Sequence, residues 1–400
     1  MTCLYLQSVR SLVSFRSCVV AILVVMGFSP PIVDADLLGQ AEEAALEGQD
    51  YMEVALTGIY QSALRASEDT GNFEVDIMGA KTLVHGDSEG TVGNGSLVYW
   101  VFSVDNFGDM QSTGDFATKA GLLWPTNDVS VSESFTAFGV FAWQQELWQD
   151  RFILHAGKMF VGNFVAESPY TASNTQTFMS RVISNDMAGR YFDTMGLGIQ
   201  LQYKGDRWFA TAGFADATAS NEFDFNTFVK GDWTVYGEAG YRIGRAQPGV
   251  SVVSALVTSA AETSTLNSQQ TVTAAFTHEF GGEGSDYAVF GRYTFGDGGE
   301  GKTGETFNAA LPLDNGGFVG LAWNKPFGRE THQIGAALMY GEPTEHRKSQ
   351  GFDDQYGIES YWKIDMTDWM HVAANIQIVN NVDENIEVVP GIRIKVHKSF

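Results

Sequence analysis

Polar and apolar residues alternate strictly at the C-terminal end of the chain. One set is apolar and the other polar: Ile392, Ile394, Val396 and the terminal Phe400 against Arg393, Lys395, His397 and Ser399. Because successive side chains of a β-strand point to opposite faces, this pattern predicts a strand with one apolar and one charged face. An apolar outer face and a polar inner face fit a sheet that wraps around a water-filled lumen in a lipid bilayer.

The same period-two alternation recurs through the chain after residue 50, in runs bounded by Gly, Asp, Asn or Pro. The runs lie near 53–61, 72–79, 96–104, 135–145, 152–159, 194–203, 207–215, 232–242, 249–258, 270–280, 286–295, 317–324, 332–341, 355–364, 368–379 and 387–398. There are sixteen, an even number, and each approaches the ~9–11 residues that a tilted strand needs to cross a membrane. The pattern predicts an all-β protein, a transmembrane antiparallel β-barrel over residues 51–400.

The gaps between these runs alternate in length. Short gaps such as 204–206 and 365–367 follow even-numbered strands, whereas long gaps such as 105–134 and 160–193 follow odd-numbered strands. Outer-membrane barrels have short periplasmic turns and long external loops, so both ends of the barrel chain are expected on the periplasmic side. The gap 80–95 breaks this alternation. It is either an enlarged turn or the sign of a misplaced early strand.

The start of the chain has the features of a secretory leader. Arg10 and Arg16 precede an apolar run over 18–28. This run is roughly half the ~20 residues that a membrane-spanning helix needs, so an uncleaved anchoring helix is the weaker alternative. We expect a signal peptide over 1–35, followed at 36–50 by a short periplasmic segment that forms a helix before the barrel.

Composition and charge exclude several classes of function. The net charge is −24 at pH 7, and because nucleic-acid binding needs a basic surface, no nucleic-acid partner is expected. Cys3 and Cys18 both lie in the leader, which leaves no disulfide or cysteine metal site in the mature chain. His278 and Glu279 are neighbours on a predicted strand and point to opposite faces, so they cannot share a metal. We predict no metal site, no cofactor and no catalytic residue.

The polar alternates of the predicted strands define a candidate site on the lumen wall. They combine carboxylates, amides and cations: Glu238, Arg242, Glu279, Arg292, Glu359, Lys363, His371, Asn375, Gln377, Arg393 and Lys395. Facing carboxylates and guanidinium groups present paired acceptors and donors, which suits neutral solutes rich in hydroxyl groups. The alternative for each residue is a solvated wall position whose ion pairs hold the barrel rigid.

A barrel of sixteen strands leaves an aqueous channel, so we expect a long loop to fold inward and narrow it. The gap 160–193 is the first candidate for this constriction loop, and 105–134 is the second. The candidate constriction residues are Tyr170, Asn174, Phe178 and Arg181.

Two groups of motifs, at the start and at the end of the predicted barrel, carry a family resemblance. The first group is Trp143–Trp148, Phe152–Lys158 and Asn163-Phe164, and the second is Glu359–Lys363, Asn375–Gln377 and Gly391–Ile394, ending at Phe400. In these motifs the chain resembles the carbohydrate-selective porins of Gram-negative outer membranes, the OprB type, over roughly residues 50–400. The resemblance implies passive, substrate-selective diffusion of monosaccharides or small oligosaccharides, commonly through homotrimers.

The expected partners are carbohydrate solutes, outer-membrane lipid with lipopolysaccharide, and the barrel-assembly machinery, which would recognise the C-terminal strand ending in Phe400. Two other functions remain open. A general diffusion porin for small hydrophilic solutes and ions would lack preference between sugars and other solutes of similar size. An outer-membrane β-barrel enzyme would need a serine or acid nucleophile aligned with a histidine on an adjacent strand.

Overall fold

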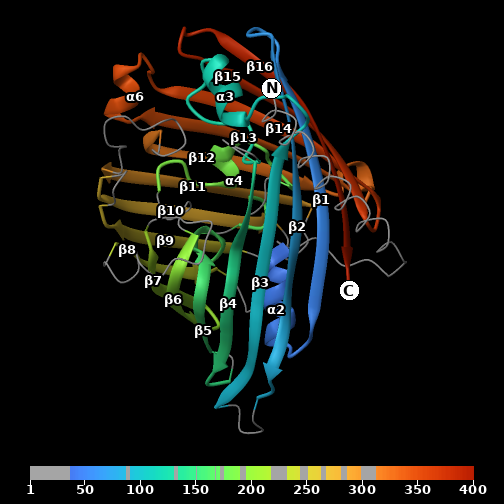
Figure 1. The fold of residues 1–400 in the computed structure, drawn as a ribbon, viewed down its shortest axis with the longest axis vertical. Coiled ribbons are helices and arrows are strands. Elements are labelled where there is room, and N and C mark those ends of the chain that lie inside the picture. The colour runs from blue at the N-terminus through green and yellow to red at the C-terminus, as the bar shows by residue number, and fades with distance from the viewer. Residues whose placement is uncertain are drawn as a thin grey trace, which may run out of the picture.

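The computed structural model describes residues 37–86, 91–129, 134–149, 151–166, 168–171, 175–189, 195–217, 232–243, 251–262, 267–280, 286–298 and 312–400. Within these ranges, sixteen antiparallel strands close into one barrel in which each strand pairs with its neighbours in sequence and β1 pairs with β16 (Figure 1). The predicted fold class is confirmed. The expected leader, 1–35, lies outside the described residues.

Every strand coincides with an alternating run of the sequence. The strands are β1 (Tyr51–Ala63), β2 (Glu68–Val84), β3 (Val92–Asn106), β4 (Phe135–Leu147), β5 (Phe152–Phe160), β6 (Met195–Lys204), β7 (Trp208–Asp216), β8 (Trp233–Arg242), β9 (Ser251–Ala260), β10 (Gln269–Phe280), β11 (Tyr287–Gly298), β12 (Leu313–Asn324), β13 (His332–Pro343), β14 (Gln355–Thr367), β15 (Met370–Asn380) and β16 (Ile386–Ser399). The helices are α2 (Leu37–Leu46), α3 (Thr113–Lys119), α4 (Arg181–Ser184) and α6 (Glu345–Ser349), with 3-10 turns η1 (Val161–Asn163) and η3 (Pro326–Gly328). Among the described residues, no helix is long and apolar enough to span a membrane.

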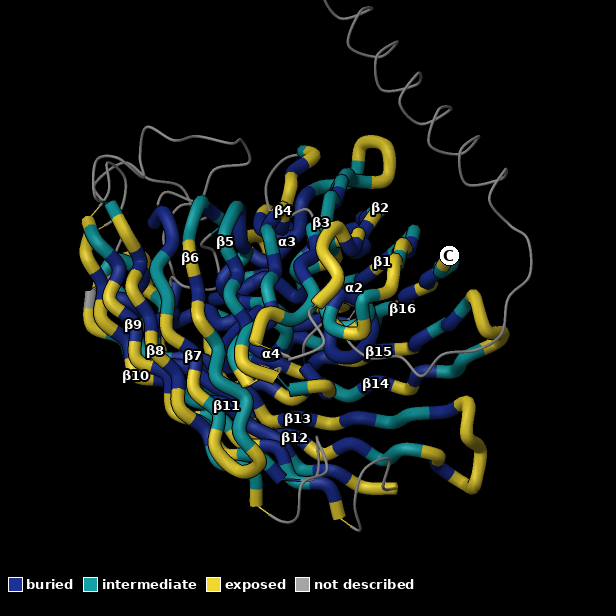
Figure 2. Tube along the Cα trace, turned by 90° about the horizontal axis from the view of Figure 1, so that it is seen from below, coloured by how far each residue is buried: buried dark blue, intermediate teal, exposed yellow. Residues whose placement is uncertain are grey.

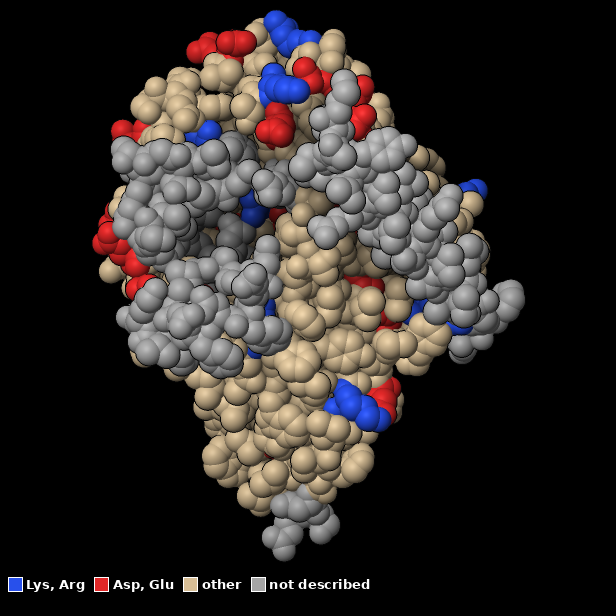
Figure 3. Space-filling view, viewed as in Figure 1, with Lys and Arg blue, Asp and Glu red and all other residues tan. Residues whose placement is uncertain are grey.

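The barrel is apolar outside and polar inside. In β16, Ile392 and Ile394 are each 45% exposed, whereas Arg393 between them is completely buried. The same alternation of buried and exposed positions runs along most strands (Figure 2). On the face over β2–β5, charged side chains gather mainly toward the upper edge, and the surface below them is largely uncharged (Figure 3). This distribution matches a sheet whose outer face contacts lipid.

The two ends of the barrel chain meet at closure. The amide of Phe400 donates to the carbonyl of Met52 at 2.8 Å, and the amide of Met52 donates back at 3.3 Å. The ladder between β1 and β16 then continues to Gln61 and Gly391. The start of β1 and the end of β16 therefore lie at the same end of the barrel, as the alternation of gap lengths predicts.

The predicted gap 80–95 is too long because the flanking strands extend into it. β2 continues to Val84 and β3 begins at Val92, which leaves a turn of ordinary length. Gly79 and Gly95 belong to these strands and make space for aromatic rings. A Cβ at Gly79 would lie 2.6 Å from the Tyr99 hydroxyl, and one at Gly95 would lie 2.4 Å from the Trp143 ring. These glycines resemble turn residues in the sequence, but they lie against aromatic side chains of the neighbouring strands.

The helix expected in 36–50 is present as α2, but it lies inside the barrel instead of before it. Ala41 and Ala45 are buried in a cluster that includes Ala80 of β2 and Val98 of β3, which are inward-facing wall positions. Seen from below, α2 lies within the ring of strands beside β1 and β2 (Figure 2). Small alanine side chains one helical turn apart let the helix approach the wall closely.

Candidate functional site

Two connections between strands enter the lumen. We call residues 122–129, from the β3–β4 connection, the first inner segment, and residues 175–188, from the β5–β6 connection, the second inner segment. Trp124 of the first and Phe178 of the second are fully buried in one cluster with wall residues such as Tyr361. The Phe178 ring meets the Tyr361 ring edge-on, with centroids 4.8 Å apart. Both segments therefore pack against the inner face of the barrel.

One carboxylate of β14 holds the middle of the second inner segment. Glu359 accepts hydrogen bonds from the backbone amides of Met179 at 2.6 Å and Ser180 at 2.9 Å. Asn375 of β15 donates to the same carboxylate at 2.5 Å. Glu359 is fully buried, so these hydrogen bonds form without competition from water. It fixes the backbone of the segment rather than facing an open channel.

Basic side chains hold both ends of the second inner segment. Arg393 of β16 donates to the carbonyls of Gln176 at 2.6 Å and Thr177 at 2.9 Å. On the other side of the lumen, Arg292 of β11 donates to the carbonyls of Ile183, at 3.3 Å, and Asn185. The segment thus spans from the β14–β16 wall to β11.

Amide side chains hold the first inner segment. Gln377 of β15 donates to the carbonyl of Thr126 at 2.7 Å. Gln61 of β1 accepts from the Thr126 hydroxyl at 2.8 Å and from the Asn127 side chain at 2.7 Å. Gln61 and Gln377 are fully buried. The wall of β1 and β15 therefore fixes this segment through neutral hydrogen bonds.

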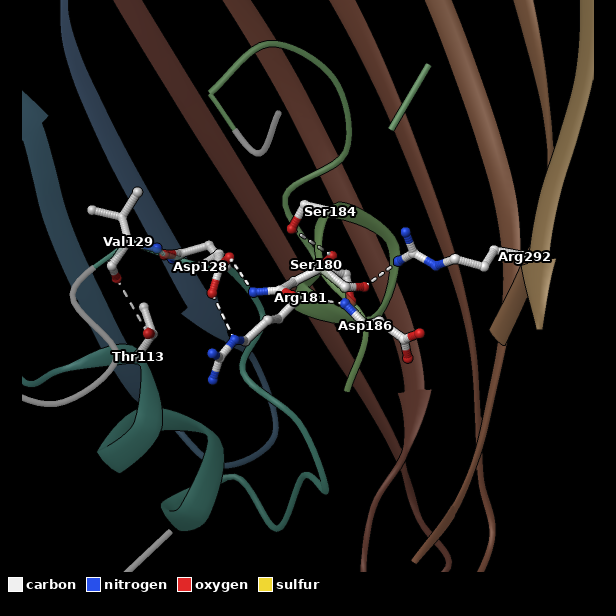
Figure 4. Close-up of polar contacts among 10 residues, drawn as sticks. Thr113, Asp128, Val129, Ser180, Arg181, Ser184, Asp186 and Arg292 are labelled. Atoms are coloured by element: carbon white, nitrogen blue, oxygen red, sulfur yellow. Dashed lines mark hydrogen bonds and ion pairs between the residues drawn. The ribbon is translucent and has the colours of Figure 1, made fainter. Parts of the chain in front are cut away.

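An ion pair joins the two inner segments where they meet. The Arg181 Nε lies 2.7 Å from Asp128 Oδ1, and Asn185 donates to the other carboxylate oxygen at 3.2 Å (Figure 4). The two charged side chains are 14% and 21% exposed, in contrast to the buried anchors of the wall. Arg181 lies between Asp128 and the wall residue Arg292 (Figure 4). The pair offers fixed donors and acceptors at the accessible edge of both segments.

A third contact region precedes the second inner segment. Glu238 of β8 accepts from the amide of Ala166 at 3.2 Å, and Glu279 of β10 accepts from the Tyr170 hydroxyl at 2.8 Å. The Tyr170 ring stacks on Phe290 with centroids 5.3 Å apart. Burial, aided by the Glu279 carboxylate, raises the pKa of the Tyr170 phenol. Tyr170 is therefore a neutral hydrogen-bond donor that fastens the chain to the wall.

The sequence suggests that the predicted lumen residues line an open channel, but in the structure most of them contact other parts of the protein. All lie on the inward face, and seven contact residues of the inward-folded connections: Glu238, Glu279, Arg292, Glu359, His371, Gln377 and Arg393. Alternation identifies the inward face but carries no information about what fills the lumen.

The remaining predicted lumen residues have other settings. Asn375 binds Glu359, and Lys363 lies 3.7 Å from the Asp365 carboxylate. Lys395 is fully buried. Arg242 is partly exposed and donates to the carbonyl of Gly205 at 2.9 Å.

The four candidate constriction residues also have different settings. Tyr170 and Phe178 are buried in packing contacts, and Arg181 forms the ion pair between the inner segments. Asn174 lies outside the described residues. The sequence analysis did not identify Asp128 as the partner of Arg181, although Asp128 lies within the second candidate loop, 105–134.

The acidic face of β2 was also missed. Glu74 and Asp76 are buried inward-facing residues, and Trp100 donates to the Asp76 carboxylate at 2.9 Å. The signal was available, because these acids alternate with the outward-facing Val75 and Ile77. Acidic side chains on β2 and basic side chains on β16 therefore lie on neighbouring parts of the inner wall.

Solved structures share this architecture. The structure of Pseudomonas putida OprB at high pH matches with a TM-score of 0.70 and 12% sequence identity, over 94% of this chain and 100% of the other. The chain has the fold of OprB. The low-pH structure of OprB matches with a TM-score of 0.50 and 14% identity, over 93% of this chain and 100% of the other.

Neither a protein-family model nor a curated protein sequence matches the chain. At this low identity, the likeness to OprB concerns the fold and not individual residues. What the comparison shows is the fold, a closed barrel of sixteen strands.

Proposed function

We propose that the protein is a bacterial outer-membrane porin through which carbohydrates, monosaccharides or small oligosaccharides, diffuse passively and selectively. The Arg181–Asp128 pair is the observation that carries this proposal, because it is charged, partly exposed and held where the two inner segments meet. A sugar hydroxyl both donates and accepts hydrogen bonds, so it can bind a guanidinium and a carboxylate together. Donors and acceptors fixed along a solute pathway select by hydrogen bonding as well as by size.

The anchoring contacts support selectivity over general diffusion. Glu359, Arg393 and Arg292 hold the backbone of the second inner segment from opposite sides. A segment held in this way keeps its polar groups in one geometry, which favours solutes that match it. The comparison with OprB does not say which solute passes through this chain. The proposed preference for carbohydrates therefore rests on the contacts of this chain itself.

The proposal includes the partners expected from the sequence. The C-terminal strand would be recognised by the barrel-assembly machinery through Phe400, whose ring is half-exposed at the end of β16. Lipid and lipopolysaccharide would surround the apolar outer face, and three copies of the chain would form a homotrimer.

The test is solute entry into liposomes. We would refold residues 36–400 into liposomes and compare swelling rates in isosmotic glucose, larger sugars and amino acids of similar size. Faster entry of sugars than of size-matched solutes is expected. Rates ranked by size alone would indicate a general diffusion porin, and no swelling with verified folded barrel would refute an open channel.

One observation favours the enzyme alternative. Ser251 of β9 and His278 of β10 are adjacent, with Ser251 Oγ 2.5 Å from His278 Nδ1. Within the described residues, no carboxylate hydrogen-bonds the other ring nitrogen of His278, and Ser251 is only 5% exposed. Phospholipid hydrolysis by the wild type that disappears in both Ser251→Ala and His278→Ala would support an enzyme.

A further inference from the structure

The outer wall of the barrel carries an apolar groove. Its volume is about 660 Å³, and its lining comes from β9–β14. Outward-facing residues form much of it, including Ala274, Phe276, Tyr293, Leu338 and Tyr356. The groove therefore opens to the side of the barrel that faces lipid, away from the solute pathway.

Strand register explains the groove. One row of paired residues contains Phe276, Gly291 and Val319, and the adjacent row contains Tyr293 and Gly317. The glycines leave the floor low beside large neighbours. A Cβ at Gly317 would lie 3.0 Å from the Tyr293 ring. Because neighbouring strands are ~4.8 Å apart, a groove from β9 to β14 is roughly 24 Å long.

This length fits one extended hydrocarbon chain. Half of a typical bilayer core is ~15 Å thick, so an acyl chain of one leaflet can lie in the groove along much of its length. The groove crosses the strands and is inclined to the membrane, as the strands are. Protein partners bury broad surfaces, whereas this groove is narrow and continuous with the lipid-facing wall.

One long side of the groove is amphipathic, because Tyr293, Tyr340 and Tyr356 lie in one row of paired residues across β11–β14. Tyr293 stacks near Tyr340 with centroids 6.4 Å apart, and Tyr340 contacts Tyr356 at 5.2 Å. The Tyr340 hydroxyl donates to Asp354 of the loop above at 3.0 Å. Tyrosine side chains of this kind lie at the level of lipid headgroups, with the ring in hydrocarbon and the hydroxyl in the polar layer.

A cation lies in the same loop region. Lys348 of α6 lies 3.0 Å from Glu345 and 3.4 Å from Glu342, and its side chain is 35% exposed. The hydrogen bond to Glu345 raises the pKa of Lys348, with a further contribution from Glu342, so the ammonium group stays charged. An ammonium group has three donors, and a lipid phosphate can accept one of them.

We propose that this groove binds one acyl chain of a phosphorylated membrane lipid, whose headgroup lies at the tyrosine rim within reach of Lys348. The chemistry on each part of the groove matches the corresponding part of such a lipid: hydrocarbon on the apolar floor, headgroup at the hydroxyls and ammonium. The inference is independent of the solute that passes through the lumen.

The experiment is native mass spectrometry of the folded barrel with dipalmitoylphosphatidylglycerol in detergent. Ala274→Leu fills the floor from an exposed outward position. Ala336→Leu makes the same change at an exposed outward position of β13 that does not line the groove. The wild type and Ala336→Leu are expected to retain one lipid that Ala274→Leu loses, and Lys348→Gln should weaken retention of this lipid but not of uncharged dipalmitoylglycerol.

Other outcomes would overturn the proposal. Equal lipid counts in all variants, or equal losses from both alanine variants, would mean that lipid binds without preference for the groove. A barrel dimer that only Ala274→Leu disrupts would assign the groove to a second copy of the chain. Heat-modifiable migration on gels checks that each variant is folded.

Discussion

Carboxylates inside the barrel fall into two groups that differ in exposure. Glu359 is fully buried and satisfied by backbone amides, whereas Asp128 is partly exposed and paired with Arg181. A buried carboxyl group bound in this way fixes the structure, since replacing one of its oxygens by a donor leaves a backbone amide without an acceptor. A partly exposed one remains able to exchange its partner for a solute. Substitutions at the two positions should therefore have different effects.

Glu359→Gln should loosen the second inner segment. The glutamine amide group brings donors against the backbone amides of Met179 and Ser180, and each donor left unsatisfied costs about 1–3 kcal/mol. We expect higher single-channel conductance and weaker discrimination between sugars, with the barrel still folded. Glu345→Gln, at a largely exposed position of α6, is the matched control. An unchanged conductance in Glu359→Gln would contradict the anchoring role.

Asp128→Asn should alter selectivity with little change in conductance. The substitution keeps the size of the side chain and removes the charge that pairs with Arg181. A hydrogen bond contributes about 0.5–1.5 kcal/mol net, so the preference for sugars over size-matched amino acids should fall by roughly two- to tenfold. Asp115→Asn, at an exposed position in α3, controls for loss of one negative charge. Equal sugar preference in both variants, measured by liposome swelling, would refute a solute-binding role for Asp128.

The Tyr170 phenol should resist ionisation. Its pKa is raised by burial and by the Glu279 carboxylate, whereas an unfolded tyrosine has a pKa of about 10. The unfolded chain therefore releases this proton first, so the contribution of the group is complete below about pH 10 and is lost as the pH rises further. In an ultraviolet titration of the folded barrel near pH 10, Tyr170→Phe should leave the phenolate absorbance unchanged. A decrease in phenolate absorbance equal to the contribution of one tyrosine would contradict this prediction.

Whole strands were predictable, whereas the contents of the barrel were not. β16 could be located because every second side chain contacts lipid, so the apolar positions repeat with the period of the strand. The bond from Glu359 to the amide of Met179 joins positions 180 residues apart and leaves no local pattern. The position of α2 inside the barrel could not be predicted either, since its alanine side chains can pack against any apolar surface. Periodicity therefore specified the wall, and tertiary packing alone specified the lumen.

The helix α2 should narrow the lumen at the end of the barrel where β1 begins and β16 ends. Ala41 is fully buried between the helix and the wall, so Ala41→Trp should displace α2 at a cost of about 1–3 kcal/mol for overpacking. We expect the single-channel conductance to rise while the barrel remains folded. Glu43→Trp places the same side chain on the exposed side of α2 and should leave the conductance unchanged. Equal conductance in the two variants would show that α2 does not limit the channel.

The molecule as a whole reverses the usual distribution of side chains in water-soluble proteins. Exposed apolar residues such as Val319, Leu338 and Ile392 cover the outside, whereas Glu359, Arg393 and Lys395 are buried inside. Glu359 and Arg393 can be accommodated because the second inner segment brings polar backbone groups to them, which costs less free energy than leaving a polar group unpaired in an apolar interior. The stability of the barrel thus depends on lipid outside and on the inner segments inside, and substitutions on the two faces test different parts of this arrangement.

A charge on the outer face should destabilise the barrel according to its depth in the membrane. Ile392 lies in the middle of β16 and Ile386 at its first residue, and both side chains are exposed. Arginine at the centre of a bilayer costs a transmembrane barrel about 2–4 kcal/mol, and near the interface about 0–1 kcal/mol. Ile392→Arg should therefore reduce the free energy of unfolding far more than Ile386→Arg, as measured by urea titration in lipid vesicles. The two variants carry the same substitution on the same face of the same strand. A similarly small decrease in the free energy of unfolding in both would mean that this face does not lie in the hydrocarbon core.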